Sequence, residues 1–366
     1  MAPMSHETAM NSGGLQAIRS ASSPGSLRSA RIEEQNRLHG RFASMPILEW
    51  NRAVGEMHDA VMGQACHLCE ELLRQEGFGP PPSHYAFVAF GSAGRAEQTL
   101  WSDQDNGLVY GDGDDAENAA YFAAFGNKLS QILEQAGYPP CPGNVMLSNP
   151  LWRGGLSRWE RQFMEWREAL GWEQVRYLMI ASDMRHIYGD QALSCALRKT
   201  MKRIMELDQG TERDVIAAVL RNTVRHKAAL NILGQVITEA AGEHAGDFDV
   251  KYGLYIPIVN AVRYFALQYG IESSSTGERI SQLYQLEAVP PRWLESCRKA
   301  FATAVKFRSI APPKLEDGML TGTHYLPQAM IKQKELRREL RDALGTVRLM
   351  YRTLQRQHRY AERKWL

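Results

Sequence analysis

The sequence predicts an α+β protein in which a small mixed-sheet domain is followed by an all-α helical bundle. Two short apolar runs, at 85–90 and 106–110, have the length and composition of β-strands and enclose a glycine-rich turn. Apolar residues recur every third or fourth position through 116–136, and the same helical spacing dominates from residue 212 onward. Strand, turn, strand and helix in this order favour a mixed sheet backed by helices, and long amphipathic helices joined by loops favour a bundle.

Composition divides the chain into three parts. With 366 residues, 44% hydrophobic and 23% charged, the chain is long enough for two domains with ordinary cores. Residues 1–44 are rich in Ser, Gly, Ala and Arg and lack a sustained apolar period, so we expect a disordered tail. We expect the mixed-sheet domain and its preceding helix at 45–205, and the helical domain at 206–366.

Charge and cysteine content limit the class of protein. The net charge of +2 gives no global attraction to nucleic acid or to a membrane. No run reaches the roughly 18 apolar residues of a membrane span, and the N-terminus lacks the apolar core of a signal peptide. Five cysteines, an odd number, favour reduced thiols. We therefore expect a cytoplasmic protein that has no membrane as its partner and for which a nucleic acid is the less favoured partner.

The first domain is expected to begin with a long helix. Apolar residues recur at helical spacing through Ile47–Gln75, and Gly77-Phe78-Gly79 followed by three prolines ends the pattern. A second helix, at 116–136, follows the second strand and would supply the crossover behind the sheet.

The second half carries four helical patterns. The first begins at Glu212, and the others cover Lys251–Tyr269, Arg279–Leu286 and Gln328–Gln357, with a capping box at Ser275–Glu278. The apolar positions of the first pattern are Val215, Ala218, Val219, Val224, Leu230, Ile232, Leu233 and Val236. Its opposite face carries Arg221, Arg225, His226 and Lys227.

The last stretch of the chain, 331–366, is strongly basic. It contains eleven Lys or Arg residues and four Asp or Glu residues. We favour a solvated amphipathic face as the interpretation. Binding to RNA or DNA is the alternative, and its affinity would fall steeply with added salt.

The glycine-rich turn between the two strands is a candidate phosphate site. Glycine permits positive φ and close approach of the backbone to a ligand, so successive amides can point at phosphate oxygens. Ser92 adds a hydroxyl and Arg95 a guanidinium for the same anion. We therefore assign Gly91, Ser92, Gly94 and Arg95 to phosphate binding, although such a motif taken alone also fits a plain turn.

Two aspartates after the turn form a candidate metal site. Asp103 and Asp105 are separated by one residue, and in an extended segment such residues lie on one face. Hard carboxylate ligands at this spacing suit Mg²⁺, with Mn²⁺ as the alternative, and the ion would also contact substrate phosphates. A pair of caps or a solvated loop is the other interpretation of Asp-x-Asp.

Together, the turn and the two aspartates resemble the signature of the nucleotidyltransferase superfamily that includes DNA polymerase β. The string from Gly91 to Tyr110 is similar to the bacterial PII-protein uridylyltransferase and glutamine-synthetase adenylyltransferase branch. The closest resemblance is to a bacterial family of nucleotidyltransferases with a C-terminal helical substrate-binding domain. This resemblance extends through Cys141–Trp159, Ser182–Asp190 and Lys251–Ile271.

The resemblance implies a third acidic residue that the sequence lacks at its usual place. In polymerase-like transferases a third carboxylate often comes from the next strand, where this chain offers Asn144 or Asn149. A neutral amide binds a metal less strongly than a carboxylate and cannot act as a general base. Asp183, which ends an apolar run, is the substitute catalytic candidate. The alternative is a structural aspartate that caps a turn or pairs with Arg185.

The implied activity is Mg²⁺-dependent transfer of a nucleoside monophosphate from a nucleoside triphosphate, with release of pyrophosphate. The acceptor is expected to be a protein hydroxyl selected by the helical domain. The two aspartates would hold the metal and the glycine turn the distal phosphates, while Arg95 would stabilise phosphate charge or brace the turn against Glu97. Two alternatives stay open: a catalytically weak nucleotide sensor, because of the missing carboxylate, and transfer to RNA ends, because of the basic C-terminal stretch.

Overall fold

The computed structural model describes residues 6–113, 115–207, 209, 211, 214–224, 229–230, 236–316 and 318–363. These residues form two compact units. The first comprises the described residues up to Arg161, together with Met184–Lys199 and Leu315–Thr321. The second comprises Gln162–Asp183, Thr200–Lys314 and the chain from Gly322 onward.

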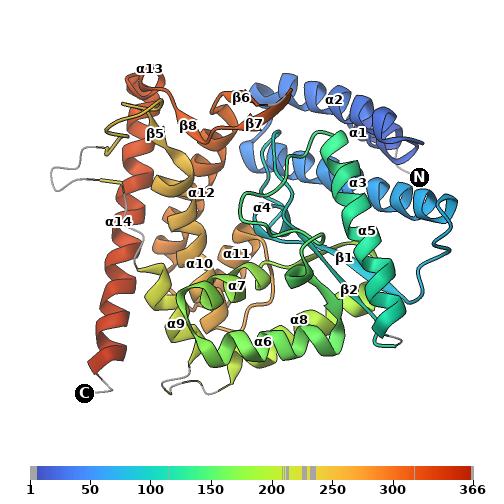
Figure 1. Ribbon diagram of the computed structural model, residues 1–366. Helices are drawn as coiled ribbons and strands as arrows, with labels where there is room; N and C mark the ends of the chain where they lie inside the picture. Colours follow the sequence, from blue (N-terminus) through green and yellow to red (C-terminus); the bar gives the residue numbers. More distant parts are fainter. Residues whose placement is uncertain are drawn as a thin grey trace. The chain divides into compact units, whose positions relative to one another are not determined.

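A four-stranded sheet lies at the centre of the first unit (Figure 1). Its order is β3 (Arg153–Gly155), β2 (Asn106–Tyr110), β1 (Tyr85–Ala89) and β4 (Arg185–Gly189). Strand β1 is antiparallel to both β2 and β4, and β2 is parallel to β3. The predicted small mixed sheet and the α+β class are therefore confirmed.

The two faces of the sheet are covered by different side chains, because neighbouring residues of a strand point in opposite directions. Tyr85, Phe87 and Leu108 pack on one face in a core shared with helices α3 and α5. On the other face Phe90 packs against Trp152, with ring centroids 5.0 Å apart, and Trp152 packs against Trp159. Strands β1 and β2 are buried on both faces, whereas the edge strand β4 is partly exposed, so the ends of β1 and β2 are held in fixed positions.

The two helices beside the sheet follow the apolar spacing of the sequence. Helix α3 covers Ile47–Gln75, the bounds that the sequence predicts, and α5 covers Asp115–Gln135, one residue from the prediction at each end. Gly77, at φ +89°, takes the left-handed conformation immediately after α3. A residue with a side chain adopts that conformation only with strain, so glycine ends the helix there.

The N-terminal segment is folded, and the expectation of a disordered tail at 1–44 is wrong for its described part. Helix α1 covers His6–Arg19 and α2 covers Pro24–Arg41, with Ser23 capping α2 in a capping box. Leu27 and Leu38 of α2 are fully buried against α3. A few apolar residues at helical spacing are enough when a neighbouring helix covers them, although the surrounding composition is polar.

The second unit is largely helical. Its helices include α7 (Trp172–Ala181), α9 (Val215–Thr223), α10 (Ile256–Gln268), α11 (Thr276–Gln285), α12 (Pro291–Ile310), α13 (Gln328–Ile331) and α14 (Lys334–Arg363). Two short pairs of strands, β5 (Phe248–Asp249) with β8 (Tyr325–Leu326) and β6 (Pro313–Glu316) with β7 (Met319–Gly322), also lie in the C-terminal half. Among the described residues, no helix has both the length and the apolar character that crossing a membrane requires.

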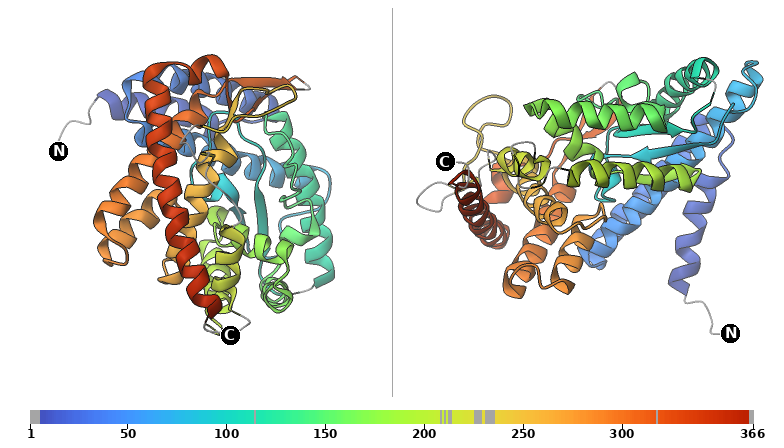
Figure 2. Two further views of the ribbon diagram at one scale, coloured as in Figure 1. Left: turned by 90° about the vertical axis from the view of Figure 1, so that its left-hand side faces the viewer. Right: turned by 90° about the horizontal axis from the view of Figure 1, so that it is seen from below.

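Several predicted helices of this unit are confirmed. A π-helical turn at Lys251–Tyr255 leads into α10, and the side chain of Ser275 accepts a hydrogen bond from the amide of Glu278 at the start of α11. Helix α14 packs against α12 (Figure 2), and Leu340 and Leu344 are among its buried residues.

The helix predicted from Glu212 to Val236 is shorter in the structure. Asp214 caps α9 through the amides of Ile216 and Ala217, and the helix ends at Thr223. Leu230 and Val236 form an antiparallel bridge, since short apolar runs suit either a strand or a helix. The predicted positions Glu212, Arg225, His226, Lys227, Ile232 and Leu233 lie outside the described residues.

The boundary between the units also differs from the prediction at 205/206. Residues 162–183 belong to the second unit because α7 packs against α9. Residues 184–199 return to the first unit because β4 pairs with β1, where Ala89 faces Arg185. The chain therefore passes between the units more than once.

Candidate active site

The glycine turn is fixed by the strand that precedes it. Phe90, after β1, donates its amide to the carbonyl of Asp105 at 2.9 Å, and the single helical turn α4 (Gly91–Gly94) follows. Gly91 has φ +55°, and a Cβ atom there would overlap the carboxylate of Asp105. Glycine is required at this position both for the backbone conformation and for the close approach of the aspartate.

Arg95 supports the turn from inside. Its side chain is 4% exposed, and its Nε donates to Glu97 at 2.9 Å. The amide of Glu97 donates in turn to the carbonyl of Ser92 at 2.8 Å. Of the two roles expected for Arg95, these contacts support bracing against Glu97. Ser92 is half-buried at the start of the turn.

A second arginine, which the sequence did not single out for the site, holds the turn from the neighbouring strand. Arg185 of β4 donates to both carboxylate oxygens of Asp59, at 2.6 and 2.8 Å, and to the carbonyl of Ala93 at 2.8 Å. Helix α3, strand β4 and the glycine turn are thus joined by one guanidinium group. Arg185 could have been found from the sequence, because it lies in Ser182–Asp190, a stretch that resembles the family.

The loop between the turn and the aspartates is held by the helices behind it. Three consecutive carbonyl groups, at 98–100, face polar side chains of α3 and α2. Asn51 donates to the first at 2.7 Å, His58 Nε2 lies 2.8 Å from the second, and Gln35 donates to the third at 2.5 Å. The approach to Asp103 is therefore anchored to the core of the first unit.

Asp103 and Asp105 lie on one side of an extended segment, as the sequence predicts. Gln104, between them, is 1% exposed and donates to the carbonyl oxygens of Ser130 and Tyr138. Because alternate side chains point in opposite directions, this anchoring turns both half-buried carboxylates away from the core. The structure brings both aspartates to the glycine turn.

A third group, Cys141, completes the cluster. Its sulfur and one oxygen of each of Asp103 and Asp105 all lie within 4.8 Å of one another. Burial, together with the charge of Asp105, raises the pKa of Cys141 to about 12. In the part of the chain that the structure describes, no other three His, Cys, Asp or Glu side chains come this close. We refer to Asp103, Asp105 and Cys141, three side chains that could together hold a metal ion, as the metal cluster.

The two asparagines at the expected place of a third carboxylate have structural roles. Asn144 is exposed with φ +53°, and Asn149 accepts from the amide of Leu151 and donates to the carbonyl of Asn144. Sequence reasoning looked for an oxygen ligand and missed the cysteine.

Asp183 lies inside the second unit, where it is 1% exposed. Its carboxylate accepts from Arg263 and from Arg279, the latter at 2.9 Å. The expected structural partner, Arg185, is bound to Asp59 instead. An aspartate held by two buried guanidinium groups has the surroundings of a structural ion pair rather than of an exposed catalytic base.

Comparison with protein families places these observations in context. A family model described as "Putative nucleotidyltransferase DUF294" matches residues 37–171, and one described as "Putative nucleotidyltransferase substrate binding domain" matches residues 213–358. Together the two matches span most of the chain, and the first contains the glycine turn and the whole metal cluster. The chain belongs to this nucleotidyltransferase family.

Family membership supports a nucleotidyltransferase role in general terms, with a nucleoside triphosphate as substrate. No curated protein matches the chain significantly. The donor set of the metal cluster fits the divalent cation that such transferases use, because carboxylate oxygens are preferred ligands of Mg²⁺ and Mn²⁺. Sulfur is not a preferred ligand of Mg²⁺, which would therefore be held by the two aspartates and by substrate phosphates.

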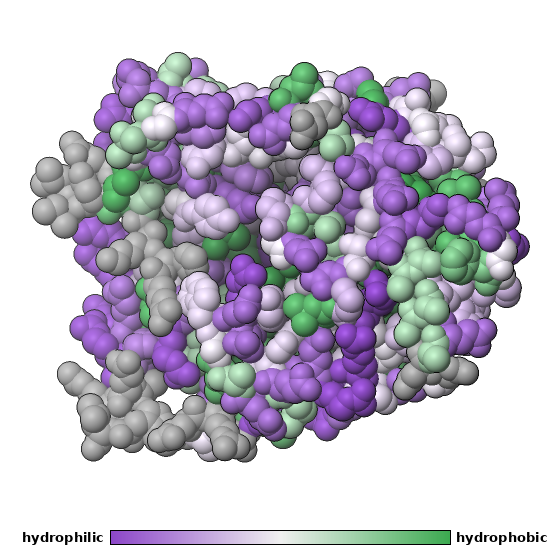
Figure 3. Space-filling model, in the orientation of Figure 1, coloured by the Kyte–Doolittle hydropathy of each residue, from purple (hydrophilic) through white to green (hydrophobic). Residues whose placement is uncertain are grey.

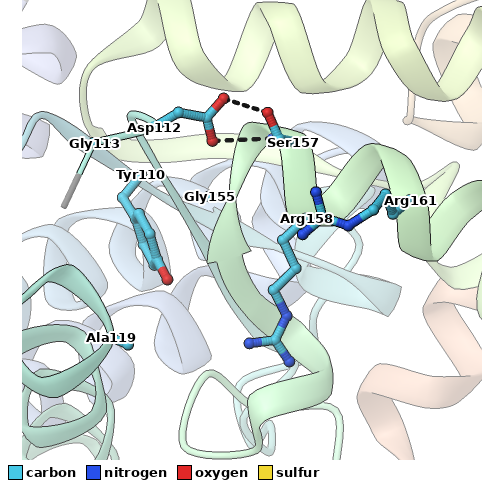
Figure 4. A pocket seen from close by; sticks show the side chains of 8 residues that line it. All are labelled: Tyr110, Asp112, Gly113, Ala119, Gly155, Ser157, Arg158 and Arg161. Atoms are coloured by element: carbon cyan, nitrogen blue, oxygen red, sulfur yellow. Dashed lines mark hydrogen bonds between the residues drawn. The ribbon is translucent and has the colours of Figure 1, made fainter. Parts of the chain in front are cut away.

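A cavity of about 320 Å³ lies at the other end of β2, remote from the metal cluster (Figure 4). Tyr110, Arg158 and Arg161 are among the residues that line it. Asp112, also in its wall, accepts from the amide and the hydroxyl of Ser157 at the start of α6 (Leu156–Ala169). Asp105 precedes β2 and Asp112 follows it, so the two carboxylates lie at opposite ends of the strand, and Asp112 accepts hydrogen bonds from the first turn of α6.

Proposed function

We propose that the protein is a Mg²⁺-dependent nucleotidyltransferase that moves a nucleoside monophosphate from a nucleoside triphosphate to a protein hydroxyl, in the manner of the PII uridylyltransferases. One observation carries the proposal: Asp103 and Asp105 converge beside the glycine turn that immediately follows β1. Five free thiols support the cytoplasm as the site of action.

The reaction exchanges one phosphorus–oxygen bond for another and releases one proton. The acceptor oxygen bonds to the α-phosphorus, the bond between the α-phosphorus and the bridging oxygen breaks, and pyrophosphate leaves while the hydroxyl proton passes to solvent. Asp103 and Asp105 would hold Mg²⁺, which neutralises charge on the triphosphate. The distal phosphates would contact the backbone of the turn at Gly91, which has no side chain of its own to keep them away.

The remaining residues of the site keep this arrangement rigid. Arg95 holds the turn from within through Glu97, and Arg185 holds it from β4. Rigid placement matters because transfer requires the reacting oxygens to be in line, and small displacements reduce rates steeply.

A labelling experiment tests the proposal. Purified protein is mixed with Mg²⁺, a cell extract and ATP or UTP that carries label on the α-phosphate or, in parallel, on the γ-phosphate. We expect the α-label on a macromolecule and the γ-label in pyrophosphate. Asp103→Ala should reduce labelling at least about 100-fold. Asp112→Asn removes an acidic residue beyond the other end of β2, outside the metal cluster, and should leave labelling intact.

The nucleotide sensor is the second candidate function. It is supported by the makeup of the metal cluster, whose third group is the sulfur of Cys141 and not a carboxylate that could act as general base. The same experiment separates the two functions. Saturable triphosphate binding without transfer of the α-label would support the sensor, and equal labelling by wild type and Asp103→Ala would remove Asp103 from the mechanism.

A further inference from the structure

The metal cluster contains a sulfur atom where the family pattern suggests an oxygen. Two hard carboxylates and one thiol form a mixed donor set, and the thiol comes from a loop rather than from a strand. Mg²⁺ prefers oxygen ligands, whereas thiolates select softer cations such as Zn²⁺. Cys141 therefore changes which ions the site can hold.

The loop that carries Cys141 is held in place from both sides. Before it, the amide of Gln104 donates to the carbonyl of Pro139 at 3.1 Å. After it, the amide of Asn106 donates to the carbonyl of Val145 at 3.0 Å, and Asn106 Oδ1 accepts from the amide of Leu147 at 2.9 Å. The sulfur is thus tied to the segment that carries the two aspartates, and its position in the cluster follows from backbone pairing.

The spacing of the three donor atoms suits a single ion. Zn²⁺ binds sulfur at about 2.3 Å and carboxylate oxygen at about 2.0–2.2 Å, so two ligands of one ion lie at most about 4.5 Å apart. The donor atoms of the metal cluster already lie within 4.8 Å of one another. Small side-chain rotations would bring all three onto one cation and leave a fourth tetrahedral position open.

We propose that Cys141 makes the metal cluster a binding site for a thiophilic divalent cation of the Zn²⁺ class, held by Asp103, Asp105 and the sulfur, and that this cation competes with Mg²⁺. Binding forms a sulfur–metal bond and releases the thiol proton to solvent. The binding itself needs no nucleotide. The competition rests on the proposed function, because it assumes that the same two aspartates hold Mg²⁺.

The other cysteines do not offer a comparable site. Cys66 and Cys69 are fully buried in α3, and Cys297 is fully buried in α12. Cys195 is exposed, but it belongs to no group of three potential ligands among the described residues. A sulfur–metal signal that depends on Cys141 can therefore be assigned to the metal cluster.

The test uses Cd²⁺ as a spectroscopic probe of the full chain, in the absence of nucleotide. Ultraviolet absorption from sulfur-to-metal charge transfer is followed as Cd²⁺ is added, and Zn²⁺ and Mg²⁺ affinities are measured by competition with a chelating dye. We expect a band that saturates at one Cd²⁺ per chain. Cys141→Ser should abolish the band and lower Zn²⁺ affinity at least about 10-fold. A loss of about 10-fold is the lower limit commonly found when even a residue that only supports a metal ligand is mutated.

Three further variants serve as controls. Cys195→Ser removes the exposed thiol and should keep the band and the Zn²⁺ affinity. Asp103→Asn should lower the affinity of the protein for both Zn²⁺ and Mg²⁺. Cys141→Asp exchanges sulfur for carboxylate oxygen, and should lose the band while gaining Mg²⁺ affinity. This last variant keeps three donors, so its result is informative if Cys141→Ser is poorly folded.

The outcomes separate this proposal from the proposed function. A band that survives in Cys141→Ser, or a Zn²⁺ affinity that does not change in that variant, would overturn the cation site. A normal band in a protein that transfers no α-label would leave the cation site standing and remove the transferase. Transfer of the α-label by a protein that shows no band would overturn the cation site and leave the transferase standing.

Discussion

At the scale of the residue, Gly91 has two roles that mutation can separate. Gly91→Ala places a side chain at φ +55°, which costs about 1–2 kcal/mol, and drives its Cβ into the carboxylate of Asp105. We expect Mg²⁺ affinity and transfer to fall at least about 10-fold. Gly77→Ala is the matched control, because its φ is +89° and no atom lies within 4 Å of the new Cβ. It should lose stability in urea unfolding and keep transfer.

Asp183 gives a prediction that distinguishes structure from catalysis. Asp183→Asn leaves Arg263 and Arg279 buried without their counter-charge, and breaking such a pair costs about 3–5 kcal/mol. Urea unfolding should detect the loss, whereas Asp342→Asn, on the exposed face of α14, should change the free energy of unfolding little. A stable Asp183→Asn protein with abolished transfer would instead restore Asp183 as a catalytic residue.

His58 makes the stability of the first unit depend on pH. Burial, reinforced by the charge of Arg31, lowers the pKa of His58 from 6.5 to about 3, so the folded protein keeps the ring neutral. Between these values the unfolded chain binds the extra proton. Stability therefore falls as pH drops below 6.5, by at most about 1.4 kcal/mol per pH unit.

Urea unfolding at pH 7, 6 and 5 checks the contribution of His58. The wild type should lose more free energy of unfolding across this range than His58→Gln, which cannot titrate. Parallel pH profiles in the two proteins would show that His58 does not supply the dependence. The comparison between variants matters because other groups titrate in the same range.

Local chemistry explains which site residues were predictable. The glycine turn, Asp103 and Asp105 lie within fifteen residues of one another, and strand alternation alone places both aspartates on one side. The partners of Asp183 are 80 and 96 residues away in sequence. Cys141 reaches the metal cluster only through the pairing of its loop with Gln104 and Asn106. Contacts of that range have no local sequence signal.

At the scale of the element, helix α2 tests whether the N-terminal segment supports the fold. Leu27 is fully buried, and Leu27→Ala should cost about 2–5 kcal/mol in urea unfolding. Ile32, on the same helix, is 40% exposed, and Ile32→Ala should change the free energy of unfolding by less than about 0.5 kcal/mol. Equal and small effects would mean that α2 does not pack on the core in solution.

The elements differ in how clearly the sequence predicts them. Helix α3 has a continuous apolar stripe and a glycine stop, so both of its ends were predictable. Helix α2 has polar composition and is stabilised by tertiary packing of a few residues such as Leu38. The segment after Thr223 differs in the opposite way from α2. Its apolar residues keep the spacing of a helix in the sequence, but α9 ends at Thr223 in the structure.

At the scale of the whole molecule, charge is nearly balanced but unevenly distributed. One face of α14 carries cations at helical spacing, which we call the basic stripe: Lys334, Arg337, Arg338, Arg341, Arg348, Arg352, Arg356 and Arg359. All are exposed except the half-buried Arg348, and none forms an ion pair with a described residue. Hydrophilic residues predominate along the edge where α14 lies (Figure 3). Exposure of these cations fits the solvated face that the sequence favours, and we propose that the stripe also contacts an acidic surface on the acceptor of the proposed transfer.

Charge reversal tests the basic stripe. Arg341→Glu combined with Arg352→Glu should raise the KM for the macromolecular acceptor about tenfold, equivalent to about 1.4 kcal/mol, and leave the KM for nucleotide unchanged. Lys299→Glu, exposed on α12, is the control and should change neither. The transferred label should resist ribonuclease and be lost to protease. Loss of label to ribonuclease would favour RNA ends as the acceptor.

The anchoring of the loop at 98–100 has a pharmacological consequence. Gln35, Asn51 and His58 hold three consecutive backbone carbonyls on the approach to Asp103, and all three come from helices behind the site. Gln35 is on α2, whereas Asn51 and His58 are on α3, so a small molecule or antibody fragment that lifted α2 would release one of the three anchors of this loop without occupying the site beside the glycine turn. Inhibition of this kind would be noncompetitive with the triphosphate and would persist at saturating substrate.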